Sequence, residues 1–541
     1  MTATITGPGA PDGGRGRDDR APRSVSPGRE DAVVRGLSEA VGGPLGDHAT
    51  TRPLDRLLTP ARIVILLAIV VFGLHWLQKA PCNDGRWDNY EQYAKFCYTD
   101  VMALYYSEQL NQGAVPYVDH PVEYPVLTGY LMGLIGLPVH AIGQDSPELN
   151  QGQVFYNLTA LVLMAFGLAA IAVTVALRRR RPWDALLFVL APALVVTATI
   201  NWDLFAVGLT AFFMYAWARQ RPVIAGIMLG LAAAAKFYPL LLIGPLIVLA
   251  LRTGRFRAAL TTIGAGAATW MVANAHAFFY AHDGWLKFFQ LSSDRPVDWG
   301  TFWYIGANWP PLLGEGQNGV EPFVSLARDI PQLNAVSYLL FGVLCLGVLA
   351  LGVLAPRRPR LAQLSFLVVA LFLLTSKVWS QQFVLWLIPL AVLARPRWGA
   401  FLVWQAAEIA YFLGFYGHLL NLANIYVMPE PAGFVYIATI RWWGLVFLVG
   451  MVVWDIVSPR RDVVWRTYGE DPDGGDFVGA RDVDWTHDAR AALRDGVGTA
   501  RVRTGELVDR LRDRLRTSTG DSREEDGPSG QEPREKTKAS G

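Results

Sequence analysis

A long series of apolar segments, each ended by a short polar or basic stretch, is the feature of this chain that most limits how it can fold. Inside a bilayer every backbone N–H and C=O group must find its partner within the protein, so such segments are expected to be helices. The 541-residue chain is 52% hydrophobic and 17% charged, whereas soluble domains average about 25% charged residues. The sequence therefore predicts an all-α, polytopic membrane protein with about 12 transmembrane helices.

The predicted membrane segments differ in length, and several are shorter than the roughly 20 residues that cross a bilayer upright. An even number of crossings must separate a cytoplasmic N-terminus from a cytoplasmic Arg178, yet three apolar runs lie between them. The run at 122–140 contains Pro125 and Pro138, so we expect it to be re-entrant or interfacial. The approximate helix cores are 63–77, 122–140, 153–177, 184–199, 203–218, 222–234, 237–251, 258–280, 334–355, 361–376, 381–395, 398–417 and 434–456.

Polar residues are sorted to two sides of the predicted bundle. The positive-inside rule places Lys/Arg-rich loops in the cytoplasm, and these loops lie at 178–182, 218–222, 252–257, 356–360, 394–398 and 458–461. Each helical hairpin between two such loops must turn on the external side. These turns lie at 201–203, 236–239, about 282–334, 375–382 and 418–430. Because polar groups at membrane depth are costly and usually mark a site, we expect the site on this external face.

Two polar tails flank the predicted membrane domain, residues 56–458. Residues 1–55 are rich in Gly, Pro, Arg, Asp and Ser without periodicity, and we expect a disordered cytoplasmic tail. Residues 459–541 are expected to form a second cytoplasmic tail, in which leucines recur at helical spacing near 504–516. That segment is either a short amphipathic helix against the membrane or a partner, or a weak solvated helix. The protein is thus expected in the cell membrane with both termini inside.

Two long external loops are expected, at 80–121 and 282–334. The first loop and the residues that follow it are dense in acidic and tyrosine side chains, and its start is flanked by Cys82 and Cys97. Outside the cytoplasm these two cysteines could form a disulfide, or they could remain two free thiols. The second loop is aromatic and carries Arg295, and it could cover a sugar or a lipid.

Asp100 is the acidic residue of the first loop that we expect to carry chemistry. It opens a predicted helix, DVMALYYSEQLNQG, that ends at Gly113. A carboxylate at a helix start is stabilised by free backbone N–H groups, so Asp100 could simply cap this helix. At a membrane face beside aromatic side chains, however, it could accept a proton from a sugar hydroxyl. The rival carboxylates are Asp84, Asp88, Asp119 and Glu123.

Two lysines lie in external turns within apolar sequence. Lys236 follows LGLAAAA and precedes Pro239, and Lys377 lies in LLTSKVWSQQFVLWLIPL. Each could extend its ammonium group to the membrane interface, or it could bind a lipid phosphate. Pro239 marks a helix start and could add backbone donors to such a phosphate site. The residues expected to contact the substrate around these cations and Asp100 are Tyr106, Tyr117, Glu123, Tyr124, Asp203, Tyr238, Trp379, Ser380 and Gln382.

The sequence shows no signature of a metal or nucleotide site. The external acids lack a DxD pair, and there is no HExxH, no P-loop and no GxGxxG after a strand. We therefore expect no metal and no cofactor, and nothing in the composition suggests nucleic-acid binding. This pattern disfavours a cytosolic nucleotide-sugar enzyme and an ATP-driven pump.

Three motifs resemble bacterial glycosyltransferase family 87. The stretch TDVMALYYSEQLNQGAVPYVDHPVEYPVL resembles that family's first external loop, AGIMLGLAAAAKFYPLLLIGPL its Lys-x-Tyr-Pro segment, and KVWSQQFVLWLIPL its segment before a late helix. Their order and spacing extend the resemblance over about residues 62–456. Some family members carry histidines where this chain has Gln381 and Gln382. Glutamine cannot take up a positive charge, so such a role would move to Lys377 or be absent.

The resemblance implies a GT-C fold with its active site on the external face. It also implies polyprenyl-phosphate sugar donors, typically of mannose, and an inverting transfer in which the loop aspartate, here Asp100, is the base. The expected activity is therefore that of a hexosyltransferase acting on a lipid-linked or cell-envelope glycan. A polyprenyl-phosphate-arabinose arabinosyltransferase is a close alternative. A secondary transporter or lipid flippase is an alternative of another class, although the internal repeats common in transporters are not detected.

Overall fold

The computed structural model describes residues 31–42, 58–310, 318–425 and 431–492, and the structural statements below refer to these residues. Contacts divide the chain into a large unit, Met1–Arg481, and a second unit, Asp482–Gly541. In the second unit residues 484–492 are helical, and Arg490 pairs with Asp482 at 3.3 Å. The helix predicted near 504–516 lies outside the described residues.

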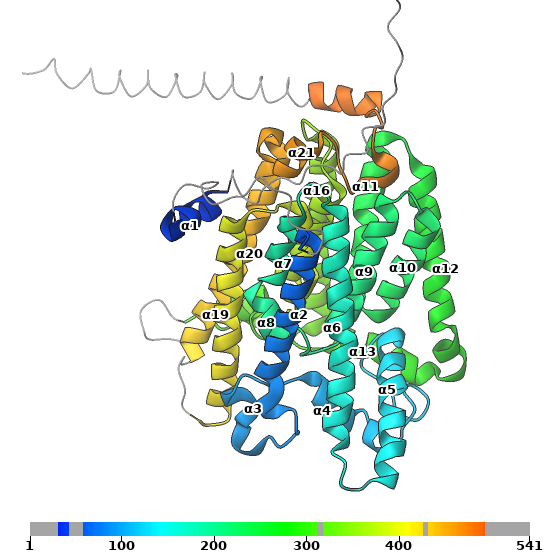
Figure 1. Ribbon diagram of the computed structural model, residues 1–541, viewed down its shortest axis with the longest axis vertical. Helices are drawn as coiled ribbons and strands as arrows, with labels where there is room; N and C mark the ends of the chain where they lie inside the picture. The colour runs from blue at the N-terminus through cyan, green and yellow to red at the C-terminus, as the bar shows by residue number, and fades with distance from the viewer. Residues whose placement is uncertain (1–30, 43–57, 311–317, 426–430, 493–541) are drawn as a thin grey trace, which may run out of the picture. The chain divides into compact units, whose positions relative to one another are not determined.

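The large unit is a bundle of helices, and no β-strand occurs in its described residues (Figure 1). The all-α prediction is thus confirmed. Most predicted apolar cores coincide with one helix each, while 184–199 is divided among shorter helices. The helices that run along the bundle are α2 (Pro60–Lys79), α6 (Gln151–Leu177), α9 (Asp203–Ala218), α10 (Pro222–Ala235), α11 (Ile243–Thr253), α12 (Phe256–Tyr280), α16 (Ile330–Leu354), α17 (Leu361–Thr375), α18 (Val384–Ala394), α19 (Trp398–Leu422) and α20 (Pro431–Val457).

Shorter helices fill the connections of the bundle. Proline often occupies their first turn, where its missing N–H is not needed, as at Pro192 of α8 and Pro182 of η4. The remaining described elements are α1 (Ala32–Gly42), α3 (Glu91–Ala94), α4 (Asp100–Ser107), α5 (Val126–Asp145), α7 (Leu186–Val189), α8 (Pro192–Thr197), α13 (His282–Asp294), α14 (Phe302–Ala307), α15 (Phe323–Arg328), α21 (Val463–Tyr468) and the 3₁₀ helices η1 (Ala80–Cys82), η2 (Asp88–Tyr90), η3 (Leu110–Gln112), η4 (Pro182–Ala185), η5 (Tyr238–Leu242), η6 (Gln381–Phe383), η7 (Pro459–Arg461) and η8 (Gly475–Phe477).

Five described helical segments are long and apolar enough to cross a membrane. They are Pro60–Cys82, Val126–Asp145, Gln151–Leu177, Ile330–Leu354 and Ala432–Val457. Other apolar helices, among them α9, α10 and α17, have only 14 to 16 residues. The number of crossings, about 12, therefore stays a prediction.

Helix α5 runs lengthwise in the part of the bundle that lies toward the acidic loop (Figure 1). In its first turn, the Thr128 hydroxyl donates to the carbonyl of Ala235, the last residue of α10. Near its other end, Gly143 packs against Gln151, the first residue of α6. Helix α5 is long and apolar enough to cross a membrane, so the expectation that the segment near 122–140 is re-entrant or interfacial stays a prediction.

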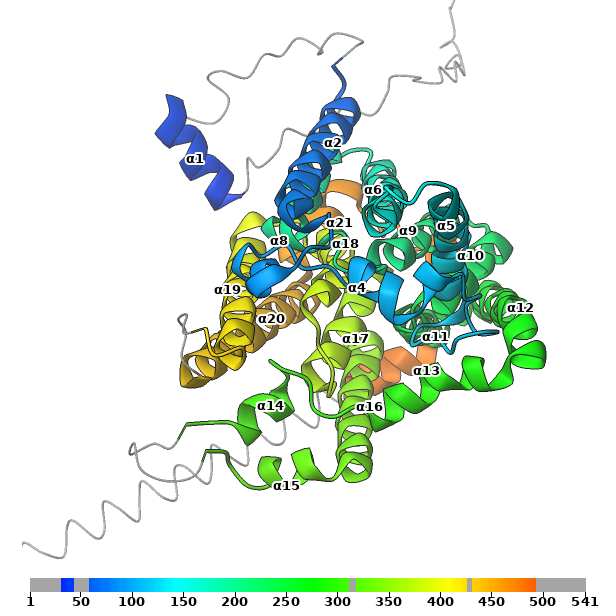
Figure 2. The same cartoon turned by 90° about the horizontal axis from the view of Figure 1, so that it is seen from below.

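Several short helices end at one level inside the bundle. Asp203 begins α9, and its Oδ1 accepts from Lys236, directly after α10, at 3.2 Å and from Trp386 in the first turn of α18 at 2.6 Å. Seen from the acidic-loop end, α4 lies across these helix ends (Figure 2). The short apolar segments are thus short because their helices stop at a recessed polar site.

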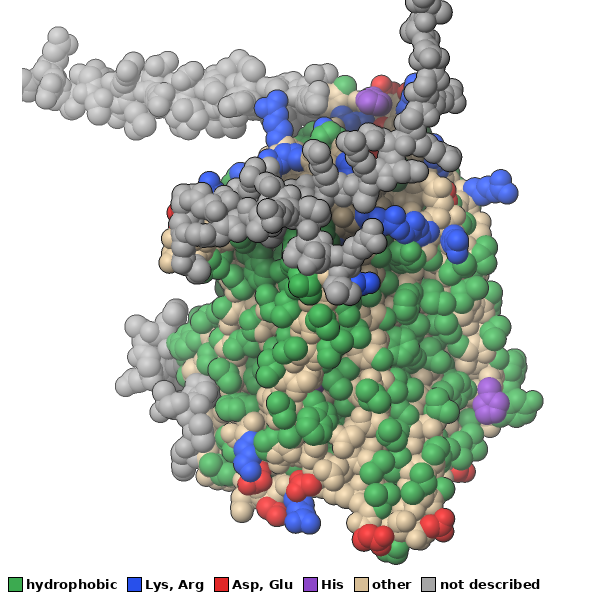
Figure 3. All heavy atoms as spheres, viewed as in Figure 1, with side chains coloured by type: hydrophobic (Ala, Val, Ile, Leu, Met, Phe, Trp, Pro, Cys, Tyr) green, Lys and Arg blue, Asp and Glu red, His purple; other side chains and the backbone are tan. Residues whose placement is uncertain are grey.

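The opposite end of the bundle carries the basic loops, and a mainly hydrophobic band separates the two ends (Figure 3). Buried arginines there are tied to the C-terminal segment, defined here as residues 459–480. The Arg178 guanidinium meets Asp473 at 2.7 Å with both side chains fully buried. Arg360 pairs with Asp462 at 2.8 Å. The compact unit therefore extends past residue 458, the boundary predicted for the membrane domain.

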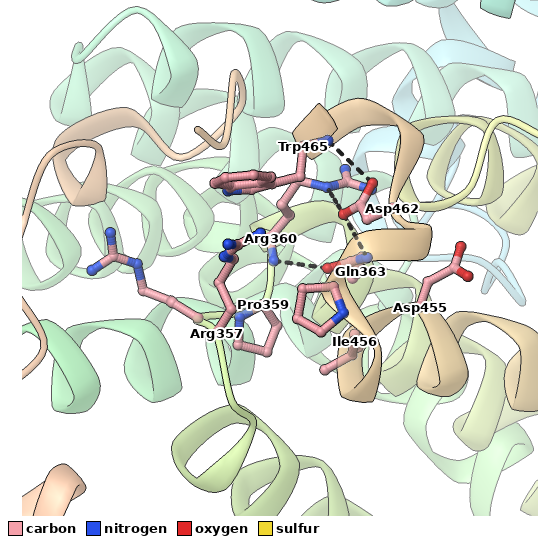
Figure 4. Close-up of a pocket in the computed structure, with 10 residues that line it drawn as sticks. Arg357, Pro359, Arg360, Gln363, Asp455, Ile456, Asp462 and Trp465 are labelled. Atoms are coloured by element: carbon pink, nitrogen blue, oxygen red, sulfur yellow. Dashed lines mark hydrogen bonds and ion pairs between the residues drawn. The ribbon is translucent and has the colours of Figure 1, made fainter. Parts of the chain in front are cut away.

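A small pocket at this basic end lies between Arg360, Asp462 and Trp465 (Figure 4). Its charged groups already have partners. Gln363 Nε2 donates to Asp462 Oδ2 at 3.1 Å, and Arg357 stacks over the Trp465 ring at 3.3 Å. We therefore read the pocket as part of the packing of the C-terminal segment.

The prediction of disorder for residues 1–55 is wrong for residues 31–42. Helix α1 begins after Asp31, whose carboxylate accepts from the backbone N–H groups of Val33 and Val34. The same carboxylate accepts from the Trp398 backbone N–H at 3.0 Å at the start of α19. One side chain thus caps two helices, and this tertiary contact orders a segment that its composition alone would leave disordered.

Candidate active site

Asp100 is the first residue of α4, but it does not cap that helix. Thr99 is the N-cap, and its Oγ1 accepts from the Val101 backbone N–H at 3.2 Å. The Thr99 hydroxyl also donates to the Thr199 carbonyl at 2.7 Å, and the Asp100 N–H donates to the Ile200 carbonyl at 2.7 Å. The loop is therefore docked on the turn between α8 and α9, and the Asp100 carboxylate is left to face other partners.

Asn201 holds the Asp100 carboxylate. Its Nδ2 donates to Asp100 Oδ2 at 2.8 Å and to the Tyr124 hydroxyl at 2.5 Å. Its Oδ1 accepts from Lys236 Nζ at 3.3 Å and from the Trp202 backbone N–H at 2.7 Å. One amide thus joins an acid, a phenol and a cation that come from three distant parts of the chain.

Lys236 is buried and held in place. It lies 3.2 Å from Asp203 Oδ1, and its ammonium group lies over the rings of Tyr124 at 5.2 Å and Phe383 at 5.5 Å. A buried ammonium group needs such a carboxylate, because an unpaired charge away from water is costly. The site therefore offers a fixed positive charge on one side of Asn201 and a carboxylate on the other.

The surroundings of Asp100 raise its pKa. Burial is the largest cause, and the nearby Asp203 carboxylate adds to it. Hydrogen bonds from Asn201 and Tyr98 and the charge of Lys236 act in the opposite direction. A carboxylate with a raised pKa is a stronger base than one in water, which suits proton abstraction from a hydroxyl.

Three residues of this site were not predicted from the sequence. Asn201 and Tyr98 contact Asp100 directly. Lys79, at the end of α2, is buried and donates from Nζ to the Tyr98 carbonyl at 3.0 Å. The signal for Lys79 was present, since it is a lysine at the acidic-loop end of an apolar helix, as Lys236 is. Asn201 offered no comparable signal, because an asparagine before a helix usually serves as a cap.

Lys377 belongs to a second polar group. Its Nζ donates to the Ser293 carbonyl at 2.7 Å, at the end of α13. The Asp298 backbone N–H donates to the Lys377 carbonyl at 2.9 Å, and the Ser380 hydroxyl lies 3.4 Å from Asp298 Oδ2. No described contact joins Lys377 to Asp100 or Lys236. The two lysines therefore belong to separate clusters, which the sequence could not show.

Arg295 and Glu123 lie between the two groups. Burial is the largest cause of the pKa shift at both Lys377 and Glu123: it lowers the pKa of Lys377 and raises that of Glu123. The charge of Arg295 lowers the pKa of both residues. Glu123 also responds to the charges of Asp100 and Lys236, and so it borders the site.

The other predicted substrate contacts divide into those that face the site and those that support it. Tyr124 faces it, as described above. Tyr117 donates to the carbonyls of Tyr124 and Pro125, both at 3.0 Å, and so fixes the loop. Tyr238 stacks on the Trp386 ring at 4.6 Å, which orients the indole that contacts Asp203.

Trp379, Gln382 and Tyr106 make no described contact with Asp100. Trp379 is buried beneath the Arg441 guanidinium, 4.0 Å from its ring. Gln382 is buried at the start of η6. Tyr106 is half exposed and packs against Gly152 in the first turn of α6.

Cys82 and Cys97 form a disulfide, with their Cα atoms 5.7 Å apart. Of the two alternatives left by the sequence, the structure shows the bonded pair. Within the described residues there is no group of three or more His, Cys, Asp or Glu side chains that could hold a metal ion.

The comparison with known families gives one match. Residues 149–380 match the sequence model of glycosyltransferase family 87. This range contains Asn201, Asp203, Lys236 and Lys377, but it does not contain Asp100. It is shorter than the range of about 62–456 over which the motifs resemble the family. No curated protein matches the chain.

Proposed function

We propose that this chain, a membrane glycosyltransferase with a family 87 domain over residues 149–380, transfers a sugar from a polyprenyl-phosphate donor to a lipid-linked or cell-envelope glycan. We propose mannose as the donor sugar and the external membrane face as the place of transfer. One observation carries this proposal: the half-buried carboxylate of Asp100 and the buried ammonium group of Lys236 share Asn201 where the short helices end.

In the proposed reaction Asp100 removes the proton from an acceptor hydroxyl. The oxygen attacks the anomeric carbon from the face opposite the phosphate, so that the new glycosidic bond forms as the bond from carbon to phosphate oxygen breaks. The leaving polyprenyl phosphate takes the electron pair, and the positive charge of Lys236 stabilises it there. The sugar configuration is inverted.

Lys377 is proposed as a second cation for the donor phosphate. Its cluster lies next to Arg295, which also acts on Glu123 at the border of the site. With two lysines available, a single phosphate can be neutralised by the protein's own side chains.

Two observations support an external site. The disulfide between Cys82 and Cys97 lies in the same loop as Asp100, and disulfides persist in oxidising compartments. The basic loops gather at the other end of the bundle, which the positive-inside rule assigns to the cytoplasm (Figure 3).

Arabinose is the second donor sugar to test, because none of the described contacts separates a pentose from a hexose. A transporter or flippase is the alternative of another class. It would need a polar path through the bundle, whereas the buried cations at the basic end are held by carboxylates.

The test is sugar transfer by purified protein in lipid vesicles. Radiolabelled polyprenyl-phosphate mannose and polyprenyl-phosphate arabinose are offered with a crude lipoglycan acceptor. We expect transfer from one donor, and a loss of about 10²–10⁴-fold in rate for Asp100→Asn because a positioned base contributes that much. The matched control is Asp119→Asn, since Asp119 lies in the same loop and accepts only from the Val115 N–H in an exposed turn.

Wild-type turnover in Asp100→Asn would refute the assignment of the base. If neither donor supports transfer while the vesicles show lipid or solute flux, the alternative of a transporter or flippase replaces the proposal.

A further inference from the structure

We propose that a row of tyrosines leading from the surface to Asp100 is the acceptor subsite, and that its ligand is an uncharged carbohydrate. The tyrosine row is defined as Tyr90, Tyr93 and Tyr98. This inference rests on the proposed function and names the acceptor class for the same site. It differs from the sequence-based expectation, which placed Tyr106 and Tyr117 at the substrate.

The tyrosine row is continuous from solvent to the base. The Tyr90 side chain is 45% exposed, and its ring lies 6.3 Å from that of Tyr93 with only 19° between the ring planes. The Tyr93 ring lies 5.7 Å from that of Tyr98. The Tyr98 hydroxyl interacts with the Asp100 carboxylate. A ligand that follows these rings therefore arrives at the base.

Two further aromatic side chains support the tyrosine row. Trp87 lies against Tyr98, with 5.3 Å between ring centroids, and donates from Nε1 to the Cys82 carbonyl at 3.1 Å. Tyr416 of α19 lies 6.1 Å from Tyr93, and Gln381 donates to its hydroxyl at 3.0 Å. Gln381 thus has a role as a support of this wall that needs no positive charge.

No described contact joins the tyrosine row to Lys236 of the proposed phosphate site. Lys236 has the rings of Tyr124 and Phe383 as its described aromatic contacts, and none from the row. A displacement with inversion needs the base beside the incoming hydroxyl and the cation beside the leaving phosphate. This separation matches an acceptor that enters along the row and a donor phosphate at Lys236.

The backbone of this segment is held in an uncommon conformation. Asn89, Tyr90 and Phe96 have φ values of 51°, 60° and 56°, in the left-handed region that aromatic residues rarely adopt. The disulfide between Cys82 and Cys97 closes the segment that contains all three. Strained backbone persists where the surrounding structure fixes it, and it is frequent at ligand sites. Here it fixes the direction of the exposed ring of Tyr90.

The charges around the row favour a neutral ligand over a phosphate. Between residues 84 and 95 there are three acids but only two bases, and Lys95 is already paired with Glu91 at 2.9 Å. Tyrosine rings offer an apolar face for the C–H groups of a sugar and a hydroxyl for its oxygens. A lipid phosphate would meet Arg86 as the only cation of this segment besides the paired Lys95, against three acids, whereas a neutral glycan would find both kinds of contact.

The test compares Tyr90→Ala with Tyr90→Phe, and Tyr338→Ala is the control because Tyr338 is a 65% exposed tyrosine on α16. The first readout is the KM for the lipoglycan acceptor. We expect Tyr90→Ala to raise it about 3- to 10-fold, as expected for one lost ring contact, with kcat and the donor KM unchanged. Tyr90→Phe keeps the ring and loses only the hydroxyl, so its acceptor KM should lie between those of the wild type and Tyr90→Ala, and Tyr338→Ala should match the wild type.

The second readout is equilibrium binding of radiolabelled, delipidated lipoglycan to the full chain in lipid nanodiscs, with dodecyl phosphate as the competing probe. We expect Tyr90→Ala to weaken glycan binding by the same factor and dodecyl phosphate not to compete. Unchanged glycan binding in Tyr90→Ala, or displacement of the glycan by dodecyl phosphate, would overturn the inference. Because this readout needs no transfer, it separates failure of the subsite from failure of the proposed reaction.

Discussion

Removal of the Asn201 side chain should change the pH dependence of the enzyme in a defined direction. Asn201 Nδ2 donates to the Asp100 carboxylate at 2.8 Å, and this bond is among the causes that lower the pKa of Asp100 against the effect of burial. A hydrogen bond to a charged group contributes about 1.5–3 kcal/mol, and one pKa unit corresponds to about 1.4 kcal/mol. The Asn201→Ala variant should therefore raise the pKa of Asp100 by about 1–2 units.

The sign of the effect follows from the proposed role of Asp100 as a base. The base works only when ionised, so activity falls as pH drops through the pKa of Asp100. A higher pKa moves this acidic limb to higher pH. At pH values well above the limb the variant should recover most of its rate, apart from what Lys236 loses with its contact to Asn201 Oδ1.

The assay is kcat/KM for sugar transfer across the pH range, which reports the pKa of the free enzyme. The control is Asn157→Ala, because Asn157 accepts only from the Trp76 indole N–H at an exposed position. An acidic limb in Asn201→Ala that stays within about 0.3 units of the wild type would refute the reasoning, because a broken bond to the ionised base must appear in its pKa.

Two further predictions concern stability. Burial raises the pKa of Glu108 to about 7. Because protonated Glu108 favours the folded state, the free energy of unfolding falls as the pH rises through about 7. At about pH 8, Glu108→Gln should thus raise the free energy of unfolding by at most about 3 kcal/mol, seen as a higher apparent thermal midpoint. At about pH 5 it should have little effect. A lower midpoint at about pH 8 would contradict this reasoning. Asp473→Asn leaves the buried Arg178 without its counter-charge, and it should cost about 3–5 kcal/mol, seen as a lower thermal midpoint with unchanged KM values. An unchanged midpoint would show that water reaches this pair.

Apolar segments and basic loops were sufficient to predict the long helices of the bundle and their order. The lysines and Asp100 were found because a charge in apolar sequence is costly and therefore noticeable. The segments at 222–234 and 361–376 looked too short for a membrane, and the structure shows that the first ends at the recessed site and the second at the polar group of Lys377.

The partners of Asp100 could not be predicted because they are brought together only by the tertiary fold. Asn201 lies 101 positions from Asp100 in sequence, and nothing local distinguishes it from an ordinary residue before a helix. The tyrosine row depends on left-handed backbone at Asn89 and Tyr90, which no local pattern of aromatic residues indicates. Helix α1 was missed for the same reason, since its order depends on a contact with Trp398.

The ion pair of Arg178 with Asp473 has a consequence for how the chain is made. The two residues are 295 positions apart, so at about 5–20 residues per second the ribosome adds Asp473 roughly 15–60 s after Arg178. During that interval α6 has already been synthesised, and the guanidinium of Arg178, which follows it, has no counter-charge from Asp473. Any nascent or truncated chain that ends before residue 473 lacks this ion pair, so the packing of the basic end of the bundle is complete only after the C-terminal segment has been synthesised.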